Sequence, residues 1–251
     1  MLSERLVSIV ARKKIVFVIV EGPSDDEALG LLLSKIYDKN TVYIHITHGD
    51  ITTAKGVNSA NILSKIGAMI SGYAKSTHLT KTHFKEIVHI VDMDGAYIPD
   101  SAVVFDPEAF TPIYSLHEIK TDKPEDLRLR NENKSKCLDR ISIANKVWGV
   151  PYQVYYMSCN LDHVLYDQMN STDDQKEASA VRFSRKYKDD LEGFIRFISE
   201  SDFSVSGGYT DSWKYIAKEL HSLERHTNFG ICIARAVSTD QTENVVEETK
   251  K

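Results

Sequence analysis

The hydrophobic pattern near the start of the chain predicts a buried strand followed directly by a helix. Residues 15–20 read Ile-Val-Phe-Val-Ile-Val, an uninterrupted β-branched and aromatic run that is typical of a parallel strand covered on both faces. The run stops at Glu21-Gly22-Pro23, and Ser24 is followed three residues later by Glu27, which is the spacing of a capping box. Apolar residues at helical spacing then predict one buried helix face, made of Leu29, Leu32, Leu33 and Ile36.

A second and a third strand are predicted further along, with a helix between them. The second strand is expected at residues 41–47, and the third, Glu-Ile-Val-His-Ile-Val, at residues 86–91. Between them, apolar residues recur at helical spacing at Ile62, Leu63, Ile66, Met69 and Ile70. The order strand, helix, strand, helix, strand favours right-handed βαβ units around a mainly parallel sheet.

The pattern in the second half of the chain is less regular. A short strand is predicted at residues 110–116, and residues 120–136 carry charges of both signs, which indicates a solvated segment. A helix is predicted around residues 135–147. A fourth strand at 152–157 and a helix start at 161–165 follow it.

The chain is therefore predicted to have three parts. Residues 1–170 form an α/β core, and residues 171–237 form a C-terminal helical region whose pattern breaks near Gly207-Gly208. Residues 238–251 are polar and are predicted to be a frayed tail. The predicted fold class is α/β, a mainly parallel sheet flanked by helices with a C-terminal helical elaboration.

The charge balance limits how the protein can contact nucleic acid. The 251 residues carry 31 Lys and Arg against 36 Asp and Glu, a net charge of -5, which argues against an electrostatic grip over the whole surface. A local basic patch is still compatible with this balance. Arg182, Arg185 and Lys186 lie at helical spacing and form either a basic stripe for a phosphate backbone or a solvated helix face.

Cysteine usage and hydropathy predict a cytoplasmic protein without a membrane span. Cys137, Cys159 and Cys232 are far apart and lack the spacing of a zinc site, so free thiols in a reducing compartment are expected. Charged residues interrupt the first apolar positions, so no secretory signal is expected. The longest uncharged stretch, residues 147–161, is too short and too polar to cross a bilayer.

Acidic residues follow the predicted strands repeatedly. Glu21 ends the first strand, and Asp25 lies four residues later. Asp92 and Asp94 follow the third strand, and Asp162 follows the fourth. Ligands of open α/β sheets bind at the carboxyl ends of the strands, and clustered carboxylates repel one another unless a cation lies between them. A site for Mg²⁺ or Mn²⁺ is therefore predicted, with the ligands Glu21, Asp25, Asp92 and Asp94.

Two motifs around these acids resemble the Toprim domain, which topoisomerases, primases and a group of nucleases share. In Val-Glu-Gly-Pro-Ser-Asp, Glu21 and Asp25 match the family's ExxxD signature. In Val-Asp-Met-Asp-Gly, Asp92 and Asp94 match its DxD signature. The family's third element, often Ser-x-Glu at the start of a helix after the fourth strand, falls on Asn160-Leu161-Asp162, where a shorter acid replaces Glu.

Within that superfamily the chain resembles nucleases of the overcoming-lysogenization-defect type and small stand-alone Toprim proteins of bacterial phage defence. The resemblance covers the strand ends between residues 15 and 165. It implies a metal-dependent nuclease that cleaves DNA or RNA, tRNA included, under the control of an ABC-type ATPase partner. It implies catalytic roles for Glu21, Asp92, Asp94 and Asp162, and it makes Lys214 the candidate for the family's lysine.

Other function classes stay open at this stage. A non-catalytic or regulatory Toprim-like module, which binds a partner or a nucleotide, would keep the acids as a scaffold, and Asp162 in place of Glu favours it. Haloacid-dehalogenase phosphatases also use a DxD motif but place it after the first strand, where this chain has Glu21-Gly22. The first turn lacks GxGxxG, which argues against a dinucleotide-binding Rossmann protein. The sequence does not decide between DNA and RNA or give the oligomeric state.

Overall fold

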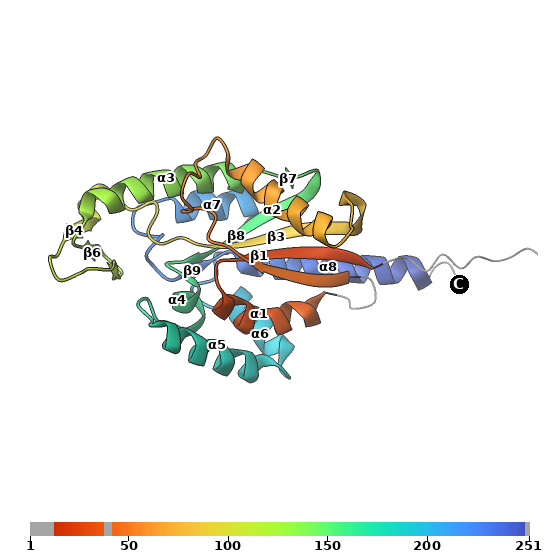
Figure 1. Ribbon diagram of the computed structural model, residues 1–251. Helices are drawn as coiled ribbons and strands as arrows, with labels where there is room; N and C mark the ends of the chain where they lie inside the picture. The colour runs from red at the N-terminus through yellow and green to blue at the C-terminus, as the bar shows by residue number, and fades with distance from the viewer. Residues whose placement is uncertain (1–12, 38–41, 249–251) are drawn as a thin grey trace, which may run out of the picture.

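The computed structural model is an α/β protein with a mainly parallel central sheet and helices on both faces (Figure 1). It describes residues 13–37 and 42–248. The strand order of the sheet is β2-β1-β3-β8-β7, with β9 paired to β8. Its strands are β1 (Lys14–Val20), β2 (Val42–His48), β3 (Phe84–Asp92), β7 (Lys146–Val147), β8 (Val150–Ser158) and β9 (His226–Thr227).

The strands β2, β1, β3 and β8 all run in the same direction. Val20 of β1 is in register with His48 of β2, and Asp92 of β3 is in register with Met157 of β8. The carboxyl ends of the strands therefore meet at one edge of the sheet, as the sequence predicts. The four predicted strands are confirmed, although position 41 lies outside the described residues.

Helices cover the two faces of the sheet in two groups, and the pleat of the strands explains why. In β1, Val16, Val18 and Val20 pack with α1, α5, α6 and α8, whereas Ile15, Phe17 and Ile19 pack with α2, α3 and α7. This central strand is therefore apolar on both sides. The helices are α1 (Pro23–Ile36), α2 (Ile62–Ser76), α3 (Pro124–Ser142), α4 (Leu161–Tyr166), α5 (Asp173–Tyr187), α6 (Leu191–Glu200), α7 (Tyr209–Ile216) and α8 (Phe229–Glu248).

A small second sheet projects from the end of the molecule at which α3 begins (Figure 1). Its order is β4-β6-β5, and the short strand predicted at residues 110–116 contains β5. A separate apolar cluster that includes Ile119 and Leu223 lies beneath it. The strands are β4 (Val103–Phe105), β5 (Ile113–Tyr114) and β6 (Ile119–Thr121).

The prediction of a solvated segment at residues 120–136 is wrong. Helix α3 begins at Pro124 and ends at Ser142, earlier at both ends than the helix predicted at residues 135–147. One face of α3 is buried against the sheet and α2, and it contains two polar residues. The buried residues of this face are Leu127, Asn131, Lys134, Cys137, Leu138 and Ile141.

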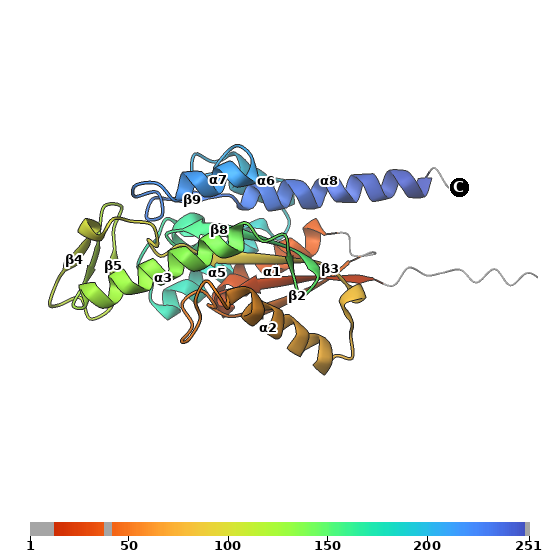
Figure 2. The same ribbon diagram turned by 90° about the horizontal axis from the view of Figure 1, so that it is seen from above.

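The C-terminal helices share a core with the α/β part of the chain. Figure 2 shows α6, α7 and α8 on the β8 side of the molecule, where α6 packs against α8. Strand β9 adds an antiparallel strand to β8 itself. Phe194 of α6 and Phe229 of α8 are fully buried in the cluster that also holds α1. Helix α8 continues to Glu248, whereas the composition predicts a frayed tail from residue 238. Within the described residues, no helix combines the length and the apolar composition that crossing a membrane requires.

Candidate active site at the carboxyl ends of the strands

Acidic residues from each of the parallel strands meet at the carboxyl edge of the sheet. Glu21 directly follows β1, and Asp92 is the last residue of β3. Asp50 lies two residues beyond β2, and Asp162 lies in the first turn of α4, which follows β8. Asp50 was not predicted, although it follows a strand end just as the other acids do. Glu21 interacts electrostatically with Asp50, Asp92 and Asp94, so these carboxylates form one cluster.

Backbone amides hold two of these carboxylates in place. The backbone N–H of Asp92 donates a hydrogen bond to Oε1 of Glu21 at 3.0 Å. The backbone N–H of Leu161 in turn donates to Oδ1 of Asp92 at 2.9 Å. The ends of β1 and β3 and the start of α4 are thus tied to one another through the acids, and their side chains are fixed before any ligand arrives.

The turn after β3 sets the direction of Asp94. Because β3 ends at Asp92, the turn that follows, and not the alternation of the strand, orients Asp94. Asp94 and Gly95 have φ values of 48° and 68°, in the left-handed region that residues other than glycine rarely adopt. The N–H of Asp94 donates to the carbonyl of Cys159 at 2.7 Å, and Nη2 of Arg130 donates to the carbonyl of Asp94 at 2.7 Å. These contacts stabilise a strained turn, and such strain is common at functional sites.

Asp25 is buried at the start of α1. Helix α1 begins at Pro23, so Gly22 precedes its first residue and Ser24 is not the cap that the sequence pattern suggests. The N–H of Gly22 donates to Oδ2 of Asp25 at 2.9 Å. Burial raises the pKa of Asp25, and this hydrogen bond lowers it in part.

Asp162 and Lys176 extend the cluster on the side of α5. Burial raises the pKa of Asp162, and the ammonium group of Lys176, which interacts with both Asp162 and Asp25, lowers it in part. Lys176 also lines a cleft of about 590 Å³ together with Pro23 and Ser24 of α1. Lys176 was not predicted, because no sequence motif marks it.

Burial also dominates the charge state of the central acids. It raises the pKa of Glu21 to about 8, an effect that Lys134 opposes and that Asp50 and Asp94 reinforce. Burial likewise raises the pKa of Asp92 well above its ordinary value, with Glu21 as the next contributor. Burial and mutual repulsion therefore disfavour the charged forms of these acids, and a bound cation would favour them.

One cation is built into the cluster by the protein itself. The side chain of Lys134 is 0% exposed, its Nζ forms an ion pair with Oδ2 of Asp94, and it lies 3.8 Å from Oε1 of Glu21. Burial tends to lower the pKa of Lys134, but Asp94, Glu21 and Asp50 outweigh this effect and raise it, so the ammonium stays charged. Burial raises the pKa of Asp50 too, yet Lys134 and hydrogen bonds from Thr53 bring it below the usual value.

The predicted lysine lies elsewhere. Lys214 of α7 is exposed, pairs with Asp211 at 3.1 Å and lines a cleft beside Asn145 and Gln153, near the opposite ends of the strands. The structure brings Lys134 to the acid cluster in its place.

The predicted basic stripe lies on the outer side of α5. Arg182, Arg185 and Lys186 are exposed. Helix α5 runs beside α1 in the same direction, since Nζ of Lys35 near the end of α1 bonds the carbonyl of Lys188. Lys186 is therefore about 15 Å along the helix from Lys176, at 1.5 Å per residue. The stripe therefore lies farther along α5 than Lys176 and does not contact the acid cluster.

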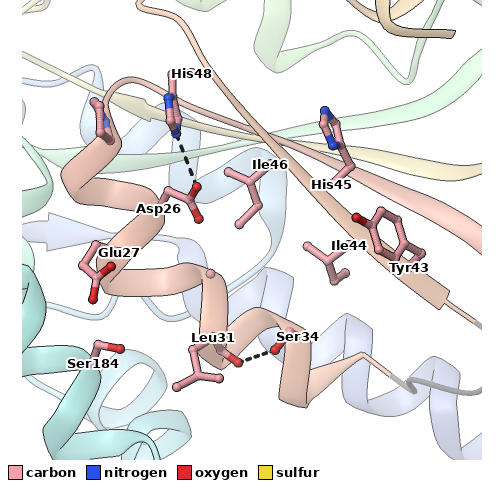
Figure 3. Close-up of a pocket in the computed structure, with 12 residues that line it drawn as sticks. Asp26, Glu27, Leu31, Ser34, Tyr43, Ile44, His45, Ile46, His48 and Ser184 are labelled. Carbon is pink, nitrogen blue, oxygen red and sulfur yellow. Dashed lines mark hydrogen bonds and ion pairs between the residues drawn. The ribbon is translucent and has the colours of Figure 1, made fainter. Parts of the chain in front are cut away.

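Two neighbouring groups do not belong to the cluster. Asp26 lines a cleft of about 580 Å³ between α1 and β2, where its Oδ2 lies 3.4 Å from Nε2 of His48 (Figure 3). Buried His163 accepts a hydrogen bond at Nδ1 from the N–H of Cys159 at 3.1 Å, and burial lowers its pKa to about 4. His163 therefore braces the end of β8 as a neutral imidazole.

The donor set suits a hard divalent cation, but the side chains are not gathered around one point. Among the described residues, no three His, Cys, Asp or Glu side chains are grouped closely enough to hold a metal ion. Mg²⁺ commonly takes only one or two carboxylates and fills its other positions with water and substrate phosphate. Each carboxylate also has about four lone-pair sites, so the hydrogen bonds on Glu21 and Asp92 leave acceptor capacity for a cation.

Comparisons of the chain with protein-family models, with curated proteins and with solved structures find no match.

Proposed function

We propose that this protein is a Toprim-like nuclease that hydrolyses phosphodiester bonds in DNA or RNA with a bound divalent metal, Mg²⁺ or Mn²⁺. One observation carries the proposal: acids from every parallel strand converge on one partly buried patch in which the pKa of Glu21 rises to about 8. Carboxylates that repel one another destabilise a fold unless they bind a cation or are protonated. Groups with strongly shifted pKa values cluster at functional sites.

The metal ligands in this proposal are Glu21, Asp92 and Asp94, with Asp25 beside them. The ion would activate a water molecule and neutralise charge on the leaving oxygen. Glu21 and Asp92 are held by backbone amides, so their oxygens are already oriented. Asp162 has a shorter side chain than the family's Glu. In this proposal it positions Lys176 and contacts the metal through a water molecule.

Helix α5 supplies the substrate path in this proposal. Lys176 lies beside Asp25 and Asp162 and can contact the phosphate next to the scissile bond. Arg182, Arg185 and Lys186 continue along the same helix and can follow the phosphate backbone away from the site. This arrangement supplies a local basic track in a protein whose net charge is -5.

The biological context in the proposal rests on the resemblance of the two acidic motifs. The nuclease would act as an effector of anti-phage defence whose activity an ABC-type ATPase partner controls. The isolated chain is then expected to be weakly active or inactive and to gain activity in the complex. Rapid, unassisted turnover by the purified chain would contradict this part of the proposal.

A non-catalytic, regulatory role is the second candidate, and the position of Lys134 favours it. An ammonium group that pairs with Asp94 and approaches Glu21 balances part of the charge for which a metal would otherwise be needed. In that case the acids and Lys134 form a scaffold, and neither metal nor nucleic acid changes them.

Cleavage assays with matched acid variants separate the two candidates. The assay follows labelled DNA and RNA with Mg²⁺, Mn²⁺ or EDTA, in the activated complex if a partner is required. Glu21→Ala and Asp92→Ala should each lower the rate at least about 100-fold, because each removes a ligand of a metal that supplies several kcal/mol of transition-state stabilisation. Asp26→Ala is the control, since Asp26 lies next to Asp25 but faces His48. Metal-dependent cleavage that persists in both test variants would exclude this mechanism.

A further inference from the structure

Lys134 is an unusual residue for the buried face of a helix. It lies between Asn131 and Leu138 on the face of α3 that packs against the sheet, and its side chain has no exposed surface. Burying an ammonium group is expensive unless opposite charges and hydrogen bonds replace its water. Asp94 and Glu21 supply these charges, and Asp50 contributes from the end of β2.

The ammonium group of Lys134 and a divalent metal would bind the same carboxylate oxygens. Nζ of Lys134 bonds Oδ2 of Asp94 and lies 3.8 Å from Oε1 of Glu21. A metal bound by these two side chains would lie within a few ångströms of the ammonium, where like charges in a partly buried site repel strongly. Lys134 also explains why the carboxylates are not gathered around one point, because its head group already lies among them.

We propose that Lys134 is a built-in counter-ion, which holds Glu21 and Asp94 while no divalent metal is bound and leaves Asp94 when the metal enters. This inference rests on the proposed function, because it assumes that the acids are a metal site. Lys134 then acts as a positioning residue. It holds the carboxylates in position and stabilises the fold in the metal-free protein. It also sets the metal concentration at which the site fills.

The test compares Lys134→Gln with a matched neighbour. Lys136→Gln removes a lysine two residues away on the same helix, but Lys136 is exposed and pairs with Glu132 on the surface. Mn²⁺ binding is measured by calorimetry, and thermal unfolding is measured with and without Mn²⁺. Lys134→Gln should bind Mn²⁺ at least about tenfold more tightly than the wild type and Lys136→Gln, since a repelling charge is gone. It should also melt at a lower temperature without metal and gain more from Mn²⁺.

The outcomes distinguish this inference from the proposed function. Equal or weaker Mn²⁺ binding by Lys134→Gln, with binding intact in the wild type, overturns the counter-ion role alone. Absence of Mn²⁺ binding in the wild type and in both variants overturns the counter-ion role and the metal-dependent nuclease together.

If Lys134→Gln does not fold, the wild type answers the question. The side-chain ¹⁵Nζ signal of Lys134 is followed by NMR during a Mg²⁺ titration, with Lys136 as the internal reference. The inference expects a shift of the Lys134 signal that saturates with metal, whereas an unchanged signal at saturating Mg²⁺ overturns it.

Discussion

Glu21 accepts a hydrogen bond from the backbone N–H of Asp92 at 3.0 Å, although 71 residues separate them in the chain. This contact joins the last residue of β3 to the residue that follows β1. A carboxylate and a strand end thereby fix each other, so the acid cluster is part of the fold rather than a set of solvated side chains.

Replacing Glu21 should change how stability depends on pH. Burial raises the pKa of Glu21 to about 8 from an ordinary value of 4.5, so the folded state holds a proton that the unfolded state has lost between these values. The stability from this group is therefore complete below about pH 4.5 and is lost as the pH rises towards 8, with a slope of at most about 1.4 kcal/mol per pH unit. In metal-free protein, Glu21→Gln should remove this loss. Urea unfolding of both proteins at pH 5 and pH 8 measures it, and identical pH slopes would contradict the account.

His89 should give a pH effect of the opposite sign. It is buried, its Nδ1 lies 2.8 Å from the hydroxyl of Tyr152, and burial lowers its pKa to about 3. The unfolded state therefore takes up a proton below about pH 6.5, and stability falls as the pH drops towards 3, by at most about 1.4 kcal/mol per pH unit. His89→Gln should reduce the acid slope of the free energy of unfolding between pH 6 and 4. The same slope in both proteins would show that His89 is not held neutral.

Gly95 should be required for the turn that aims Asp94. Its φ of 68° disfavours other residues, and an added Cβ would lie 2.8 Å from Ile119 and 2.9 Å from Leu223. Gly95→Ala should therefore lower the free energy of unfolding by about 1–3 kcal/mol. Gly72→Ala is the control, because a Cβ at this position of α2 meets nothing within 4 Å and should be neutral or stabilising. Equal stability of the two variants would argue against a strained turn.

Lys176 should contribute more to nucleic-acid binding than any single member of the outer stripe. Lys176→Ala removes a cation beside Asp25 and Asp162, so it should weaken binding and lower the salt slope of the affinity by about one. The triple change of Arg182, Arg185 and Lys186 to Ala should remove contacts with phosphates farther from the acid cluster. It should therefore weaken binding and lower the salt slope of the affinity by more than Lys176→Ala does. Affinities measured over a range of salt concentrations test both. An unchanged slope in the triple variant would return the stripe to a solvated helix face.

The strand ends were predictable because buried parallel strands appear in the sequence as uninterrupted apolar runs. The apolar run before Glu21 and the run before Asp92 each stop abruptly at an acid, and the sheet brings these ends together. Asp50 follows the same rule after β2, but this strand contains the polar residues His45, Thr47 and His48, which made its signal weaker. The positive φ of Asp94 could not be predicted, since it depends on contacts with Cys159 and Arg130 from distant parts of the chain.

Lys134 was missed for a physical reason. The buried face of α3 repeats at helical spacing, but Asn131 and Lys134 occupy two of its positions, so the segment looks solvated. Its burial depends on acids that come from other strands, which no local pattern records. The spacing of Leu127, Leu138 and Ile141 was the available signal, since these residues share one helix face with Lys134.

Anomalous diffraction from crystals soaked in Mn²⁺ shows directly whether the acid cluster binds a metal ion. We expect a Mn²⁺ peak bounded by the carboxylates of Glu21, Asp92 and Asp94, with the side chain of Lys134 moved away from Asp94. No peak at this position at saturating Mn²⁺, with Lys134 still paired to Asp94, would contradict the claim that the acid cluster is a metal site.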